Sequence, residues 1–124
     1  MILEQLKEFI ELCQHPAIKE KFDGWRIGDE WVDKIGGRNY THYENDVFGL
    51  PPIPKDVIWL PPVFSYTDSS RSLWAWVDWE LFGLATHEDG LTTVYSPKSN
   101  FQYTGPFFIA LAKAVIWKYE QENK

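Results

Sequence analysis

The chain has 124 residues, of which 44% are hydrophobic and 24% are charged, and its formal net charge is −6. A chain of this length fits one domain that buries its own core, and the composition is typical of a soluble globular protein, which excludes a disordered chain or a membrane protein. An acidic chain repels a phosphate backbone, so nucleic-acid binding through a basic patch is disfavoured, and we expect a single domain over residues 1–124.

A helical pattern opens the chain. Over residues 2–14, apolar side chains recur at helical spacing on one stripe and charged side chains occupy the other side, which predicts an amphipathic helix. Pro16 interrupts this helix because proline lacks the backbone N–H, and it is also suited to open a second short helical turn. The pair Asp23-Gly24 then closes the helical part.

Short strands are predicted in the middle of the chain. Residues 25–32 suit a strand with a turn or bulge at Gly28-Asp29. After a turn at Gly36-Gly37, residues 39–47 alternate polar with aromatic or β-branched side chains, which predicts a hairpin. A proline-rich connection then leads to a short strand over residues 56–60.

The segment richest in Trp and Phe comes next. Residues 73–84 carry apolar side chains at alternate positions on both faces, which predicts an interior strand. The turn sequence Glu88-Asp89-Gly90 follows, and residues 91–95 have the composition of a strand, so a second hairpin is expected here.

A second long helix closes the chain. Pro106 suits its first helical position, with Gly105 or Thr104 as the cap, and the residues beyond form a broad apolar face. The order of helix, strands and helix predicts an α+β fold. In this fold an antiparallel sheet of about four to six strands carries the N-terminal and C-terminal helices on one face.

Two features bear on the compartment. The longest strongly apolar stretch, residues 106–117, is interrupted by Lys113 and is too short to span a bilayer. Residues 1–8 lack the basic leader and uncharged apolar run of a secretory signal. We therefore expect a cytoplasmic protein without a membrane partner.

The aromatic content is the most unusual feature, with seven Trp, six Tyr and eight Phe. Such side chains combine a large rigid contact area with a polar handle, and they are enriched at interfaces. We expect Trp74, Trp76 and Trp79 to pack mostly in the core and to leave one or two rings for a surface. Trp117 falls outside the apolar arc of the closing helix, so it either packs against a loop or belongs to a contact surface. These four tryptophans are the candidate interaction residues.

Three histidines are the candidate nitrogen ligands: His15, His42 and His87. His42 and His87 each lie near acidic residues, and with one carboxylate they supply the residue types of a zinc or iron site. No two ligands share a helix at the spacing that makes such a motif specific. We therefore predict exposed strand and turn histidines, no bound metal and no cofactor.

Cys13 is the only cysteine, which excludes an intramolecular disulfide, and we expect a small buried hydrophobe on the first helix. Asp78 and Glu80 are two residues apart in a predicted strand and face the same side. They form either a carboxylate pair with one raised pKa or the solvated rim of the sheet. Residues 72–97 contain acids but no Lys or Arg, which also permits an acidic mimic of nucleic acid, although such a mimic needs denser charge.

Short segments along most of the chain carry a resemblance to a known group. They are His15-Pro16-Ala17-Ile18, Gly24-Trp25, Gly28-Asp29, Ile58-Trp59-Leu60-Pro61 and Ala110-Leu111-Ala112-Lys113-Ala114-Val115. On these segments the chain resembles small, uncharacterised proteins encoded in bacteriophages and prophages. The resemblance implies a viral or prophage origin and action in the host cytoplasm, and it brings no catalytic residue.

Two functional hypotheses follow. The leading one is a non-enzymatic protein that binds a host or phage protein, or itself as a homo-oligomer. The alternative is a small hydrolase or metal-dependent enzyme that uses His42, His87 and nearby carboxylates. The sequence does not suggest a phosphate-binding protein. Gly36-Gly37 is not followed by the glycine, lysine and serine of a phosphate-binding loop.

Overall fold

The computed structural model describes residues 3–33, 37–41, 53–54, 56–65 and 68–124 of the chain. Its helices are α1 (Leu3–Cys13), α2 (Pro16–Lys19), α3 (Leu73–Trp76) and α4 (Phe107–Glu122), with a short 3-10 helix η1 (Ser69–Arg71). Its strands are β1 (Glu30–Val32), β2 (Arg38–Tyr40), β3 (Ile58–Leu60), β4 (Gly83–Thr86), β5 (Thr92–Tyr95) and β6 (Gln102–Gly105). The fold belongs to the α+β class, as predicted.

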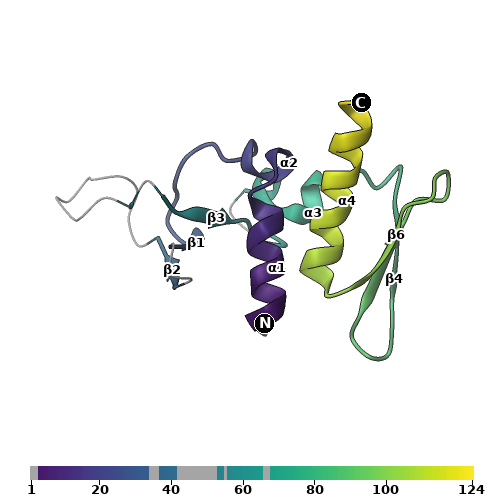
Figure 1. Ribbon diagram of the computed structural model, residues 1–124, viewed down its shortest axis with the longest axis horizontal. Helices are drawn as coiled ribbons and strands as arrows, with labels where there is room; N and C mark the ends of the chain where they lie inside the picture. The colour runs from purple at the N-terminus through teal and green to yellow at the C-terminus, as the bar shows by residue number, and fades with distance from the viewer. Residues whose placement is uncertain (1–2, 34–36, 42–52, 55, 66–67) are drawn as a thin grey trace.

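The described strands form two antiparallel sheets, in the orders β2-β1-β3 and β4-β5-β6. Helices α1 and α4 pack together, and Figure 1 shows them side by side between the two sheets. Helix α1 contacts β3, whereas α4 contacts β5 and β6. The strands expected in one sheet are therefore divided between two, and each sheet has a long helix against it.

Helix α1 buries the apolar stripe that its sequence predicts. The Phe9 side chain is buried, and its ring meets the ring of Phe108 on α4 edge-on, with 5.0 Å between the centroids. The helix ends before Pro16, where His15 becomes the cap of α2. The His15 Nδ1 accepts a hydrogen bond from the Ala17 backbone N–H at 3.0 Å. Proline then starts α2, as predicted.

Helix α4 is the centre of the core. It contacts α1, α2 and α3 as well as β5 and β6, so its apolar side chains are buried around most of its circumference. Ile109 and Leu111 are fully buried on it. The helix begins at Phe107, with Pro106 as its N-cap, which corrects the prediction that Pro106 is the first helical residue. The proline side chain has no acceptor to offer, so this end has no side-chain cap.

The predicted interior strand over residues 73–84 is wrong. The segment begins with helix α3, whose cap is Ser72: its hydroxyl accepts a hydrogen bond from the Ala75 backbone N–H at 3.3 Å. A turn follows at Asp78, whose carboxylate accepts from the Glu80 backbone N–H at 3.1 Å, and β4 starts only after this turn. Side chains that cap a helix or a turn satisfy the backbone locally, so they outweigh an alternating apolar pattern.

The C-terminal sheet contains a hairpin at the predicted turn, but its first strand is β4 rather than residues 73–84, and one further strand follows. Strands β4 and β5 pair around a turn in which Gly90 has a φ of +84°, a conformation that favours glycine. Strand β6 then pairs with β5, although the sequence pattern predicted no strand there. This sheet therefore follows the order of the chain.

The N-terminal strands are shorter than predicted. Strand β1 starts only after a turn at Gly28, whose φ is +93°. Strand β2 covers the start of the strand predicted over residues 39–47, of which residues 42–47 lie outside the described part of the chain. Strand β3 lies within the predicted range of residues 56–60.

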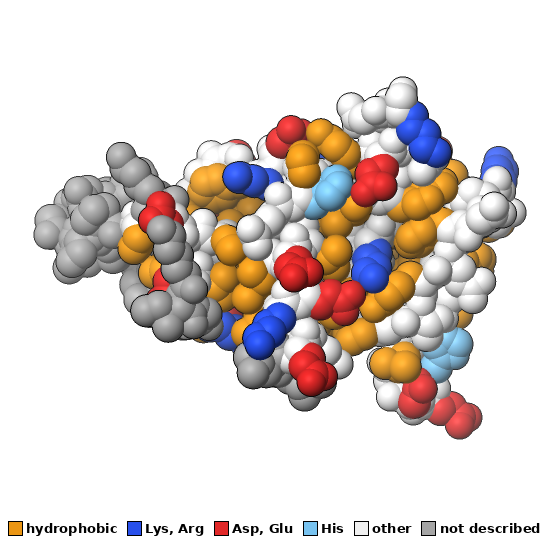
Figure 2. Space-filling view, viewed as in Figure 1, with side chains coloured by type: hydrophobic (Ala, Val, Ile, Leu, Met, Phe, Trp, Pro, Cys, Tyr) orange, Lys and Arg blue, Asp and Glu red, His pale blue; other side chains and the backbone are white. Residues whose placement is uncertain are grey.

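Charged side chains of both signs cover the central helices. Figure 2 shows acidic and basic side chains interspersed over this face. One such pair joins α1 to α4, with 3.2 Å between the Lys113 Nζ and the Glu8 carboxylate, and the same ammonium lies 4.2 Å from the ring centroid of Tyr103. Among the described residues, no helix combines the length and the apolar character needed to cross a membrane.

Candidate functional site

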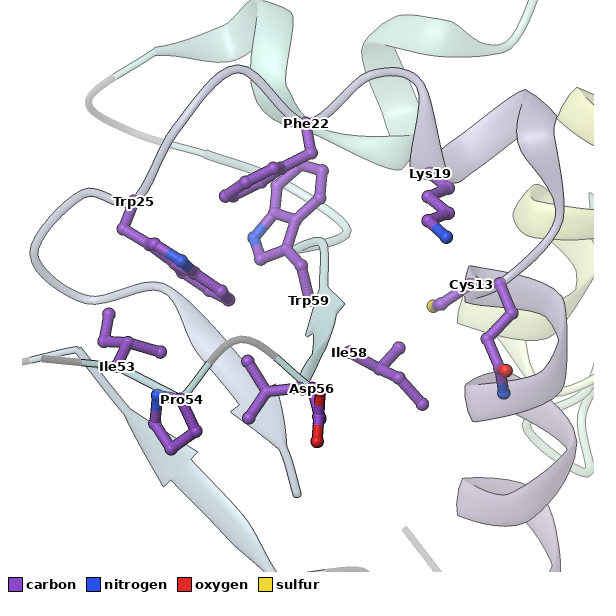
Figure 3. A pocket seen from close by; sticks show the side chains of 11 residues that line it. Cys13, Lys19, Phe22, Trp25, Ile53, Pro54, Asp56, Ile58 and Trp59 are labelled. Carbon is purple, nitrogen blue, oxygen red and sulfur yellow. The ribbon is translucent and has the colours of Figure 1, made fainter. Parts of the chain in front are cut away.

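A pocket of about 600 Å³ opens beside strand β3. One side is formed by β3 and the residues before it, and the other by the end of α1, by α2 and by the loop after α2 (Figure 3). The consecutive residues Val57, Ile58 and Trp59 all line it. Val57 directly precedes β3, and Ile58 and Trp59 are its first two residues, so the pocket lies beside the start of this strand. Among the described strands only β1 pairs with β3, so β3 is an outer strand of its sheet there.

Three aromatic rings form one wall of the pocket. Phe22 packs edge-on against Trp25, with 4.8 Å between ring centroids, and in a tilted arrangement against Trp59, at 5.4 Å. Ile53 and Pro54 lie below Trp25 in Figure 3 and make this part of the lining apolar. Rings of this kind provide the rigid apolar surface on which ligands are commonly anchored.

Trp59 brings an unused hydrogen-bond donor to this wall. The residue is only 7% exposed, and its indole Nε1–H is buried with no acceptor among the described residues. In Figure 3 this nitrogen lies on the edge of the ring that is turned toward Trp25. A buried N–H without an acceptor lowers stability, so an acceptor supplied by a ligand would remove that cost.

Arg71 fixes the position of the wall. Its guanidinium carbon lies 5.0 Å from the centroid of the Trp59 ring, a cation–π contact. The guanidinium also donates hydrogen bonds to the Asp29 carboxylate at 2.9 Å, to the Asp23 carboxylate at 3.0 Å and to the Gly24 carbonyl at 2.7 Å. These acceptors belong to the loop that carries part of the wall, so one buried side chain ties that loop to strand β3.

A second arginine extends this network at the surface. Arg26 donates to the Asp68 carboxylate at 2.6 Å and to the Asp23 carboxylate at 3.0 Å. Hydrogen bonds from Ser70 and then from Arg26 lower the pKa of Asp68. The loop before β1 and the segment before α3 are therefore joined by charged groups as well as by aromatic rings.

The polar groups of the pocket are a cation, an amide, a carboxylate and a thiol. Lys19 extends from α2 toward the pocket in Figure 3, and no described residue forms an ion pair with it. Gln14 supplies the amide. Asp56 lies on the other side, before β3. Cys13 is buried, as predicted, and burial, followed by the charge of Glu30, raises its pKa far above the usual value. The thiol therefore stays protonated and is no nucleophile.

His15 and His87 lie on different elements, and each has its own partner. The Nε2 of His15 faces the Glu120 carboxylate at 3.3 Å. His87 lies in the turn between β4 and β5, and its Nε2 is 2.7 Å from the Thr93 hydroxyl. The third histidine, His42, lies outside the described residues. In the part of the chain that the structure describes, no three His, Cys, Asp or Glu side chains gather around a metal position.

Of the two predictions for Asp78 and Glu80, the carboxylate pair is wrong. Asp78 lies in the turn after α3, and the Lys118 Nζ is 3.2 Å from its carboxylate. The hydrogen bond from Lys118, followed by one from the Glu80 backbone N–H, lowers the pKa of Asp78. The charged neighbour of Asp78 is therefore a lysine from α4 and not a second carboxylate, so the pKa of Asp78 is lowered and not raised.

The three tryptophans around α3 are half-buried and belong to two clusters. Trp74 and Trp79 stack with 4.4 Å between ring centroids, and the Trp79 indole N–H donates to the Trp74 carbonyl at 2.9 Å. Trp76 lies against Trp59, with 5.9 Å between centroids, and donates to the Ser70 carbonyl at 2.6 Å. Trp76 thus supports the pocket wall, whereas the other two rings do not line the pocket.

Trp117 packs on the side of the C-terminal sheet. Its ring centroid lies 5.8 Å from that of Phe82 and 5.5 Å from that of Phe101. The same ring lines a shallower second pocket with mostly polar neighbours, among them Lys98 and Lys124. Trp117 is half-buried, so part of the ring packs within the fold and part faces solvent.

The residues that build the pocket wall are ones that sequence reasoning did not single out as functional. Phe22 and Trp25 share one loop, but Trp59 and Arg71 come from distant segments, and no local motif joins the four. One signal was available. Arg71 directly precedes the long segment without Lys or Arg, and an arginine next to an apolar aromatic run is a candidate for burial against distant acids.

Comparison of the chain with protein-family models, with curated proteins and with solved structures finds no match. The function therefore has to be inferred from the pocket itself. It combines an aromatic wall, a cation and a buried N–H donor that has no acceptor among the described residues. A few polar groups placed within an apolar lining are the usual composition of a recognition site.

Proposed function

We propose that this protein is a non-enzymatic module that binds another protein, from a host or from a phage, through the pocket beside β3. The observation that carries the proposal is the wall of Phe22, Trp25 and Trp59, fixed by the buried Arg71. A wall that is rigid before the partner arrives loses little conformational entropy on binding, so more of the contact energy contributes to affinity.

The chemistry of the pocket supports recognition over catalysis. Cys13 is protonated, and among the described lining residues neither Gln14 nor Lys19 forms a nucleophile with an adjacent base. Lys19 and the Trp59 N–H supply a charge and a donor, which orient a bound group. These groups suit binding without a chemical step.

The surroundings of the pocket support a protein as the partner. Its volume of about 600 Å³ accommodates several side chains of a partner, and it lies beside β3, the outer strand of its sheet among the described strands. Ile27, two residues beyond Trp25 on the same loop, is 66% exposed and extends the apolar surface. The phage or prophage setting is proposed only from the resemblance of short segments of the chain, such as Ile58-Trp59-Leu60-Pro61, to proteins of phages and prophages.

The test combines capture with two tryptophan variants. Partners captured by the full chain from prophage-bearing cells are produced separately, and their affinity is measured by isothermal titration calorimetry for the wild type, Trp25→Ala and Trp117→Ala. We expect Trp25→Ala to weaken binding at least about tenfold, because an aromatic anchor in the pocket is lost, and Trp117→Ala to leave it unchanged. The opposite result would move the interface to the surface around Trp117.

The alternative of a small hydrolase or metal-dependent enzyme has one observation in its favour, the contact of His87 with the Thr93 hydroxyl. Elemental analysis of the purified chain tests it. We expect no stoichiometric zinc or iron, because no two histidines have the spacing of a metal motif. Stoichiometric metal that is lost in a His42→Ala, His87→Ala double variant would overturn the prediction of no metal and favour the enzyme hypothesis instead.

A further inference from the structure

We infer that the occupant of the pocket is an extended segment of the partner protein with three features: a bulky apolar side chain, a backbone carbonyl that accepts a hydrogen bond from the Trp59 Nε1–H, and a neighbouring carboxylate that pairs with Lys19. This inference rests on the proposed function and specifies the ligand of the same site.

The acceptor is inferred from the hydrogen bonds that the neighbouring indole N–H groups make. Trp76 donates to the Ser70 carbonyl at 2.6 Å, and Trp79 donates to the Trp74 carbonyl at 2.9 Å. Backbone carbonyls are therefore the partners that neighbouring indole N–H groups find within this chain. The Trp59 N–H finds none among the described residues, although Trp59 lines the pocket. A carbonyl of an incoming peptide supplies the missing acceptor.

The extended conformation is inferred from the position of the pocket. Ile58 and Trp59 of β3 line it, with Val57 directly before them, and β3 is the outer strand of the sheet β2-β1-β3 among the described strands. An outer strand leaves a row of backbone N–H and C=O groups unpaired, and extended peptides bind along such rows. A ligand that follows this edge presents side chains alternately toward and away from the aromatic wall.

The apolar side chain and the carboxylate are inferred from the two sides of the pocket. Trp25, Ile53 and Pro54 form an apolar surface, which favours a bulky apolar side chain. Lys19 extends from α2 toward the pocket. A carboxylate of the segment is attracted to this ammonium, which forms no ion pair with a described residue, so the charge of Lys19 orients the segment in the pocket.

The chain provides a matched control for the donor. Trp31 lies directly opposite Trp59 in the pairing of β1 with β3, and its indole N–H is likewise buried without an acceptor among the described residues. Trp31 does not line the pocket. Trp59→Phe and Trp31→Phe therefore remove the same group from neighbouring positions, only one of which contacts the occupant.

The probe is a yeast-displayed library of random short peptides, selected on the full chain. Selected peptides are synthesised and titrated into isotope-labelled protein, and the indole N–H resonances, assigned in the wild type, are followed by NMR. We expect the tightest peptides to combine a bulky apolar residue with a nearby Asp or Glu and to shift the Trp59 resonance. Trp59→Phe and Lys19→Met should each weaken them about tenfold, the loss expected for one buried or charged hydrogen bond, and Trp31→Phe should not.

The outcomes separate this inference from the proposed function. Peptides that bind without moving the Trp59 resonance, and equally well to Trp59→Phe, would overturn the inference and leave protein binding intact. If no peptide binds while benzoate alone shifts the Trp59 resonance, the site takes small carboxylates, and both proposals are wrong. The resonance is read on the wild-type chain, so the result does not depend on the folding of any variant.

Discussion

The two sheets of this protein are built in different ways. The sheet β4-β5-β6 consists of strands that follow one another in the chain, each paired with the next. In the sheet β2-β1-β3, β3 comes from a distant segment of the chain. The loop before β1 is held in place by a hydrogen bond from Arg71 to Asp29, which are 42 positions apart in the sequence. The comparison teaches that the pocket lies in the half that depends on long-range contacts, whereas the other half forms from local ones.

The two halves also differ in their polar groups. In the C-terminal sheet the Thr93 hydroxyl lies 2.6 Å from the Thr104 hydroxyl, although the nearby Ser96 hydroxyl is buried without a partner among the described residues. In the N-terminal sheet two residues that pair across β1 and β3, Trp31 and Trp59, both have buried donors without an acceptor in the described part of the chain. Unsatisfied buried groups are rare, and of this pair only the Trp59 donor belongs to a residue that lines the pocket.

A charge in the core shared by both halves gives the largest expected effect. Leu111 is fully buried on α4, so Leu111→Asp buries a carboxylate and lowers the free energy of unfolding by more than about 4 kcal/mol. Circular dichroism and urea denaturation measure the loss. The control is Ile27→Asp, at a side chain that is 66% exposed, where the change stays within about 0.5 kcal/mol. Equal losses in the two variants would contradict the central position of α4.

Arg71→Met removes the long-range contacts of the N-terminal half and leaves the C-terminal sheet unchanged. It leaves the buried carboxylate of Asp29 without its arginine, so we expect the free energy of unfolding to fall by about 3–5 kcal/mol. Urea denaturation gives this value. Arg38→Met, which removes a more exposed ion pair with Glu30, is the matched control and should cost about 0–1 kcal/mol. If both arginine variants lose equally little, long-range contacts do not hold this half together.

Cys13 tests how tightly the pocket half is closed, because this residue lines the pocket and is still buried. Burial raises its pKa, so the thiolate that reacts with iodoacetamide is absent at neutral pH. We expect mass spectrometry to find the thiol unmodified in the folded chain and fully modified after unfolding in urea. The partly loosened Arg71→Met variant should react at an intermediate rate. Rapid modification of the native wild type would mean that this end of the pocket is open.

The smallest expected effect concerns the ion pair of Asp78 with Lys118, which joins the turn after α3 to α4. The pKa of Asp78 in the folded chain lies below the usual 3.8, so the unfolded chain takes up this proton first as the pH falls. The contribution to stability is therefore present above about pH 4 and is lost as the pH drops through the folded-state pKa. Denaturation curves at several acidic pH values measure it. Asp78→Asn and Lys118→Met should each reduce the acid sensitivity, and a change in only one of them would contradict the pairing.

Local signals in the sequence predicted the parts of the fold that local interactions form. The apolar stripe of residues 2–14 predicted α1, and Pro16 predicted the start of α2. The turn Glu88-Asp89-Gly90 predicted the hairpin of β4 and β5. Each of these signals acts between residues only a few positions apart, so the sequence is sufficient to identify the element.

The sequence was ambiguous where two local patterns compete. Residues 73–84 alternate like a strand, but Ser72 caps a helix and Asp78 caps a turn within the same segment. Within this segment, Trp74 and Phe82 pack against rings of α4, and Trp76 packs against Trp59. An apolar pattern indicates that side chains are buried, but tertiary contacts decide which element they pack against.

Composition determined that this protein is rich in aromatic side chains, and only the tertiary structure decided which of them line a pocket. Phe22 and Trp25 come from the loop after α2, whereas Trp59 comes from an outer strand. They meet because Arg71 joins acids of that loop to the Trp59 ring. Such contacts join positions far apart in the chain, and no local propensity encodes which distant groups come together.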